Sequence, residues 1–231
     1  MNTIDSPDTT PTGSYSPPVD KLLTYGEPDV INAASWPNYL ELGLTAEHIP
    51  ALIHMATNKE LDFADFKSIE AGAPIHAWRT LGQLQAVEAV EPLLTLFDRA
   101  EDNEWVAEEV PETFGLIGPQ ALPMLEAYLT DRTHKEWSRI NVSTGVKAIG
   151  IRWPDARLAS IAILSKLLEN SAPDETDFNS FLVTDLIGLK AKEAAPVIEQ
   201  AFKDDRIDLS IPGDWDDVRE RLDLLSTEEV E

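Results

Sequence analysis

Glycines recur along this chain at a nearly constant spacing, each at the close of a stretch with helical character. They are Gly82, Gly115, Gly150 and Gly188, so that successive glycines are 33, 35 and 38 residues apart. A period of this length is typical of helical repeats, in which one hairpin cannot bury its apolar face alone. The spacing therefore predicts a stack of helical hairpins. We expect each glycine to end the first helix of its hairpin with a positive φ.

A second helical stretch begins with a proline in most of the hairpins. These stretches cover residues 45–56, 88–97, 120–129 and 193–202, and their prolines are Pro50, Pro92, Pro123 and Pro196. Proline is tolerated in a first turn because the N–H groups there have no intrahelical acceptor. Residues 154–170 have the apolar spacing of an amphipathic helix without an internal proline, and we assign them to the remaining hairpin. Five hairpins are thus expected between Thr45 and Arg206.

The two ends of the chain fall outside this repeat. Residues 1–18 are rich in Pro, Ser, Thr and Asp, which predicts a disordered tail, and residues 226–231 predict a short acidic tail. The folded domain is expected to span residues 19–225. Within it, residues 19–43 and 208–225 are expected to cap the two ends of the stack.

Three segments carry a family resemblance: "LGQLQAVEAVEPLL" (81–94), "FGLIGPQALPMLEAYL" (114–129) and "IGLKAKEAAPVIEQAF" (187–202). They resemble HEAT-like repeats, particularly the short subtype found in phycobilisome lyases, and the whole chain is similar to uncharacterised bacterial HEAT-repeat proteins. The resemblance implies an all-α fold, a right-handed α-α superhelix (HEAT-like, armadillo-like solenoid) of about five helical hairpins with terminal caps. HEAT-like arrays serve as scaffolds, adaptors and occasionally chromophore lyases, so the resemblance specifies fold better than function.

Patterns for catalysis, cofactor binding or metal binding are not found in the sequence. The four histidines do not form an HExxH site, and His48 and His54 would lie about 240° apart around a helix. No Gly-rich phosphate loop, GxSxG elbow or EF-hand loop is present. The lack of Cys excludes disulfides and thiolate metal sites. We therefore expect no enzymatic activity and no cofactor.

Charge is abundant and unevenly distributed. The net charge of −24 disfavours nucleic acid and anionic lipid, and no apolar run is long enough for a membrane helix, so a cytoplasmic protein is expected. Residues 80–131 carry eleven acids against one base, a net of −10, whereas residues 132–166 carry seven bases against two acids, a net of +5. These bases either pair with acids of adjacent repeats or form a docking patch for an anionic surface, beside an acidic repeat that accepts a basic segment.

The six tryptophans do not recur at one position of the repeat, which favours individual packing roles; Trp105, among acids, is the candidate anchor for a partner. The candidate partner-binding residues are Trp105, Glu108, Glu109, Arg139, Arg152 and Arg157. The leading expectation is a non-enzymatic scaffold, adaptor or assembly factor that binds another protein. The alternatives are a bilin lyase or chaperone acting on a phycobiliprotein, suggested only by the repeat subtype, and nucleic-acid binding through the basic repeat, which the net charge disfavours.

Overall fold

The computed structural model of the 231-residue chain describes residues 15–26, 28, 33–62 and 68–225. Every regular element in these ranges is helical and none is a β-strand, which confirms the all-α prediction. Residues 1–14 and 226–231, which contain most of the predicted tails, lie outside the described residues. Tyr15, which falls within the predicted N-terminal tail, shares a hydrogen bond of 2.9 Å between its hydroxyl and His54 Nδ1.

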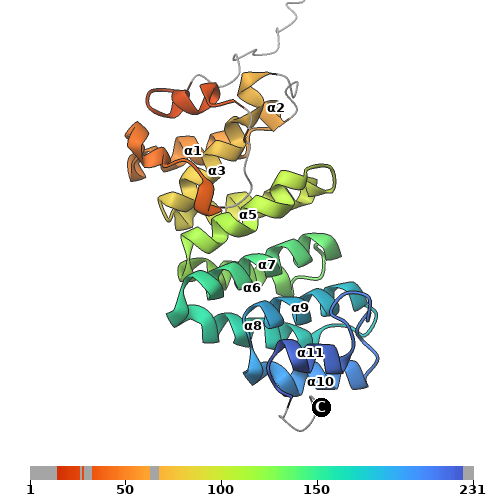
Figure 1. The fold of residues 1–231 in the computed structure, drawn as a ribbon. Coiled ribbons are helices and arrows are strands. Elements are labelled where there is room, and N and C mark those ends of the chain that lie inside the picture. The colour runs from red at the N-terminus through yellow and green to blue at the C-terminus, as the bar shows by residue number, and fades with distance from the viewer. Residues whose placement is uncertain (1–14, 27, 29–32, 63–67, 226–231) are drawn as a thin grey trace, which may run out of the picture.

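The chain runs from one end of the long axis of the molecule to the other, with the N-terminal helices at the top of Figure 1 and the C-terminal helices at the bottom. The α-helices of the described chain are α1 (Ile49–Ala56), α2 (Lys59–Asp62), α3 (Ala73–Gln83), α4 (Val90–Leu94), α5 (Glu104–Ile117), α6 (Leu122–Thr130), α7 (Glu136–Arg152), α8 (Arg157–Asn170), α9 (Thr176–Gly188), α10 (Ala195–Lys203) and α11 (Trp215–Arg221). Short 3-10 segments join them: η1 (Val19–Thr24), η2 (Ala33–Ser35), η3 (Tyr39–Leu42), η4 (Ala46–His48), η5 (Ile69–Gly72), η6 (Val87–Ala89), η7 (Thr95–Asp102), η8 (Pro119–Ala121), η9 (Pro154–Ala156) and η10 (Lys192–Ala194).

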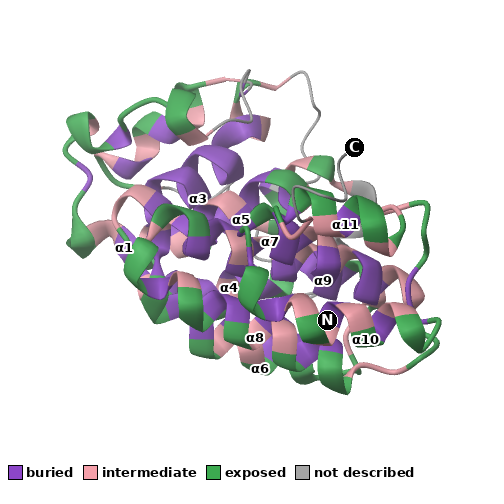
Figure 2. Cartoon of the chain, turned by 60° about the horizontal axis from the view of Figure 1, so that its bottom comes forward, coloured by how far each residue is buried: buried purple, intermediate pink, exposed green. Residues whose placement is uncertain are grey.

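Most of the helices form two layers. Helices α3, α5, α7 and α9 pack against one another in sequence, and we call them the first-helix layer (Figure 2). Helices α1, α4, α6, α8 and α10 pack in sequence in the same way and form the second-helix layer. The apolar side chains that face between the layers form one continuous core, whose fully buried members include Trp78, Leu93, Phe114, Leu125, Ile149 and Phe178.

The prolines begin second-layer helices as predicted. Pro50, Pro123 and Pro196 lie in the first turn of α1, α6 and α10, and Pro92 is the third residue of α4. The stretch 154–170 is also helical, as η9 and α8. Each of these five helices is entered through a 3-10 turn, which is a common way to begin a helix whose first N–H groups lack acceptors.

The prediction for the repeating glycines was wrong. Gly82, Gly115, Gly150 and Gly188 lie within helices without a positive φ, and Gln85, Gly118 and Lys190 adopt positive φ two or three residues later. The sequence could not separate the two cases, because a helix-packing glycine and a helix-ending glycine both stand near the close of an apolar stretch. The structure shows the packing role at the contact between α5 and α7.

Side chains of α5 and α7 interlock across that contact. A Cβ at Gly115 would lie 2.9 Å from the Ala148 Cβ, closer than real Cβ atoms approach a neighbour. A Cβ at Gly145 of α7 would lie 2.9 Å from Cδ2 of Phe114 on α5. Each helix therefore presents one small and one larger residue to the other, and the two glycines allow the helices to approach closely.

Candidate functional site

Glu109, one of the acidic candidates, is part of the interior rather than the surface. It lies on α5, is fully buried, and forms an ion pair with Arg79 of α3. Arg79 Nε donates to Glu109 Oε2 over 2.8 Å, and Trp78 Nε1 donates to the same oxygen over 3.3 Å. A partner therefore cannot reach Glu109 in this structure, and its charge joins two helices of the first-helix layer.

The other two candidates on α5 lie closer to solvent. Trp105 is half-buried and packs against the hydrophobic core, and Glu108 is exposed. Glu108 forms no ion pair with any residue of the described chain. These two side chains remain surface candidates, and neither lines the grooves that described residues form beside α6.

Arg139 is buried and ties three segments together. Its Nε donates to the carbonyl oxygen of Leu129 over 2.9 Å, at the end of α6. Its guanidinium pairs with Glu175, which precedes α9, and lies 4.0 Å from the centroid of the Phe178 ring. The arginine thus satisfies a carbonyl at a helix C-terminus and links α7 to the following hairpin.

Arg157 has a similar linking role, whereas Arg152 does not. Arg157 Nε donates to the Leu189 carbonyl over 3.0 Å, and Nη1 donates to Glu193 over 3.0 Å. Arg152 is exposed at the end of α7. The structure therefore does not bring Arg139, Arg152 and Arg157 together as one free basic patch.

Most bases between residues 132 and 166 are engaged inside the protein. Five of the seven bond to carboxylates or carbonyl groups of neighbouring segments, namely Arg132, Arg139, Lys147, Arg157 and Lys166. Lys147 pairs with Asp185 over 2.8 Å, and Ser143 donates to the same carboxylate over 2.7 Å. Burial raises the Asp185 pKa although both neighbours act to lower it. This cluster joins α7 to α9.

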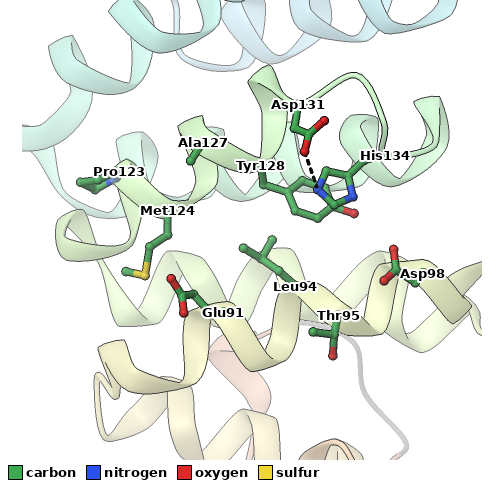
Figure 3. A pocket seen from close by; sticks show the side chains of 10 residues that line it. All are labelled: Glu91, Leu94, Thr95, Asp98, Pro123, Met124, Ala127, Tyr128, Asp131 and His134. Atoms are coloured by element: carbon green, nitrogen blue, oxygen red, sulfur yellow. Dashed lines mark ion pairs between the residues drawn. The ribbon is translucent and has the colours of Figure 1, made fainter.

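A groove between α4 and α6 is lined by acidic side chains, in contrast to the bases described above. We call it the acidic groove; its volume is about 480 Å³. Figure 3 shows its two walls, one from α4 and η7 and the other from α6 and the loop that follows. The lining residues are Glu91, Leu94, Thr95, Asp98, Pro123, Met124, Ala127, Tyr128, Asp131 and His134.

The groups around one end of this groove interact with one another. The Asp131 carboxylate accepts a hydrogen bond of 2.9 Å from the Thr133 N–H, which lowers the pKa of Asp131 below its usual range. His134 Nε2 lies 4.0 Å from Asp131, and the His134 ring stacks on Tyr128 with centroids 3.7 Å apart. Burial, and then the nearby charge of Asp98, raise the pKa of Tyr128 to about 12. At neutral pH the tyrosine is therefore a neutral phenol beside carboxylates.

A second groove lies on the other side of α6. Its volume is about 610 Å³, and it is lined by Pro119, Leu122, Pro123, Glu126, Asp155, Ala156, Ala159, Ala162 and Ile163. We call it the apolar groove, because two carboxylates are its only charged groups. Pro123 lines both grooves, so the two form one surface across α4, α6 and α8. Short exposed side chains such as Ala159 and Ala162 leave this surface hollowed.

Comparison with known proteins gives no assignment. No family model, curated protein or solved structure matches the chain. In the described ranges, no group of three or more His, Asp or Glu side chains is arranged to hold a metal ion, and no helix has the length and apolar character to cross a bilayer. The HEAT-like resemblance therefore stays a prediction, and the two grooves are the features of the structure that bear on function.

Sequence reasoning did not find the grooves. The available signal was the set of small or apolar residues on the outer face of α6 and α8, such as Pro123, Ala127 and Ala162. The sequence also pointed to Trp105 as the exposed aromatic anchor, whereas in the structure Trp137 is 57% exposed and Trp105 is half-buried. The Trp137 ring meets Phe181 edge-on, with centroids 5.7 Å apart.

Proposed function

We propose that this protein is a non-enzymatic scaffold, adaptor or assembly factor of the cytoplasm that holds another protein on its second-helix layer. We further propose that its helices form a right-handed, HEAT-like solenoid. The observation that carries the proposal is the adjoining pair of grooves across α4, α6 and α8. Extended surfaces formed by successive repeats are the usual binding surfaces of repeat proteins.

The distribution of polar groups supports the same face. Several charged side chains of the first-helix layer form ion pairs between neighbouring helices, such as Arg79 with Glu109 and Lys147 with Asp185. Exposed acids without an ion pair in the described chain occur on both layers, with Glu104 and Glu108 on α5, but Glu91 of α4 and Asp98 of η7 line a groove beside apolar side chains. Unpaired charge beside apolar surface is the combination that polar-rimmed protein interfaces use.

The alternative functions are less well supported. A bilin carries anionic propionate groups, and three carboxylates of the acidic groove would repel them. Nucleic acid would need free cations for its phosphates, whereas five of the seven bases in residues 132–166 already have partners within the protein. We therefore favour protein binding.

Site-specific photo-cross-linking tests the proposal. A benzoylphenylalanine at position 159, exposed in the apolar groove, is expected to yield one discrete cross-linked protein in cells of the source organism. The matched control carries the same group at position 108, exposed on α5 in the other layer. Cross-links from position 108 alone would place the interface near Trp105 instead, and the absence of any specific cross-link from both positions would refute the scaffold proposal.

A further inference from the structure

The residues that line the acidic groove include three carboxylates and no lysine or arginine. Glu91 and Asp98 lie on one wall and Asp131 on the other (Figure 3). The one cationic candidate among the lining residues is His134, 4.0 Å from Asp131. Carboxylates gathered in this way attract a cationic group of a ligand and select against anionic ones.

The acidic groove also has apolar lining residues, which a ligand would have to cover. Leu94 lies between Glu91 and Asp98 and points toward Tyr128, and Met124 and Ala127 extend the apolar surface along α6 (Figure 3). A small hydrated cation would leave this surface uncovered. A polypeptide segment with an apolar side chain next to its cation would satisfy both requirements.

Tyr128 gives a second and independent indication of a ligand. The side chain is 8% exposed and lines the groove, and its buried hydroxyl makes no hydrogen bond of normal geometry in the described chain; the nearby Ser138 hydroxyl, which acts to lower the Tyr128 pKa, donates to the Phe97 carbonyl. A buried hydroxyl without a partner is destabilising unless a ligand supplies one. The hydroxyl lies toward the end of the groove where Asp98 also lies, so both oxygens could accept from one planar, multiply donating group (Figure 3).

We propose that the acidic groove binds an arginine of a partner protein, with an apolar residue beside that arginine on the Leu94 and Met124 surface. This inference rests on the proposed function and names the chemistry that the partner brings. Arginine fits better than lysine for two reasons. Its planar guanidinium can donate to two carboxylates at once, and it can lie flat against the stacked rings of Tyr128 and His134.

The protein contains its own reporter for this experiment. It has three methionines, Met1, Met55 and Met124, of which Met55 is fully buried and Met124 lies in the groove. We would label the methionine methyl groups of the full chain with ¹³C and titrate in a capped Leu-Arg-Leu-Arg-Leu peptide. The Met124 signal is expected to shift with saturation while the Met55 signal stays in place.

Peptides of the same length, with citrulline or lysine in place of arginine, measure what the guanidinium contributes to binding. The citrulline peptide keeps the shape and loses the charge, and it should bind at least about tenfold more weakly. The lysine peptide should fall between the two. Equal binding of the citrulline and arginine peptides would overturn the inference, because apolar contact alone would then explain the affinity.

Two double variants separate the groove from general attraction to an acidic protein. Glu91→Gln with Asp98→Asn should weaken the arginine peptide at least about tenfold. Glu104→Gln with Glu108→Gln removes the same charge from exposed positions of α5 and should leave binding nearly unchanged. Both variants should keep the circular dichroism spectrum of the wild type. Equal losses in the two variants would show diffuse electrostatic attraction and would also overturn the inference.

The outcomes keep this inference distinct from the scaffold proposal. If position 159 cross-links to a protein but no arginine peptide shifts Met124, the scaffold proposal stands and the arginine site is wrong. If the peptide binds the groove and no protein cross-links, the groove recognises arginine and the scaffold proposal is wrong. Failure of both experiments would refute both.

Discussion

Two neighbouring stretches of this chain carry opposite charge and use it in opposite ways. Between residues 132 and 166, most bases bond to carboxylates or carbonyls of adjacent segments. Between residues 80 and 131, Glu109 and Glu126 pair with cations, whereas six other acids lie exposed or half-buried without an ion pair in the described chain: Glu88, Glu91, Asp98, Glu104, Glu108 and Glu112. The basic stretch therefore contributes to the internal structure, and the acidic stretch leaves most of its described charge in contact with solvent.

The difference shows that net charge along a sequence does not reveal which charges are free. In a chain with a large excess of acids, the few bases find internal partners, and the surplus acids stay in water. Four predictions test this contrast, in order of decreasing expected effect.

Glu109, the buried acid of the acidic stretch, should contribute to stability as the paired bases do. Glu109→Ala leaves Arg79 buried without its carboxylate, so the free energy of unfolding should fall by about 3 to 5 kcal/mol. The control Glu108→Ala changes an exposed acid on the same helix and should change stability by no more than about 0.5 kcal/mol. Urea unfolding measures both. Similar midpoints for the two variants would show that burial does not distinguish them.

Arg139 and Arg152 give the matching test within the basic stretch. Arg139→Met removes the donor to the Leu129 carbonyl and the partner of Glu175, which should lower the free energy of unfolding by about 2 to 3 kcal/mol. Arg152→Met alters an exposed side chain and should have an effect within about 0.5 kcal/mol. If Arg152→Met is as harmful as Arg139→Met in urea unfolding, the division between engaged and free bases is wrong.

Acid should weaken the link made by Glu175. Burial acts to raise its pKa, but the N–H of Ala172 and the Arg139 guanidinium together hold the pKa below its usual range. The unfolded chain therefore binds this proton more readily, and the stabilisation is present above about pH 4.3 and is lost as pH falls through the folded pKa. Wild type should exceed Glu175→Gln by about 1 kcal/mol at neutral pH, with the gap narrowing in acid. Unfolding at a series of pH values measures it, and a gap that widens in acid would contradict the assignment.

Neutralising the free acids should have the smallest effect. Glu91→Gln with Asp98→Asn relieves repulsion and should raise stability by no more than about 0.5 kcal/mol, with the gain vanishing at high salt. Lys166→Gln removes an exposed pair with Glu126 and should instead lower stability by up to about 1 kcal/mol. Thermal unfolding at low and high salt compares them. A marked loss of stability in the acidic double variant would mean that those acids have structural partners after all.

The helical character of the chain could be read from its sequence, but the contacts between helices could not. Pro50, Pro123 and Pro196 mark helix starts because the local chemistry of a first turn decides where proline is tolerated. The sequence predicted the wrong role for Gly115, because a glycine is needed there for the close approach of Ala148, which lies on another helix. A repeat period predicts that helices stack, not which side chains meet.

The candidate site was less predictable for the same reason. The sequence shows that Arg139 is basic, but the pairing with Glu175 depends on which face of α7 meets the next hairpin. The acidic groove depends on the separation of α4 and α6 and on short side chains between them. Of the six candidates, Glu108 and Arg152 are exposed, Trp105 and Arg157 are half-buried, and Glu109 and Arg139 are buried.

The contact between Gly115 and Ala148 also limits how this chain can change. The methyl group of Ala148 occupies the space that a side chain at position 115 would need. A larger residue at 115 is therefore expected to require a glycine at 148, so the two positions, 33 residues apart, must vary together. An engineer who lengthens the protein by copying a hairpin would have to copy both halves of such contacts, since the fit belongs to the junction between hairpins and not to either one.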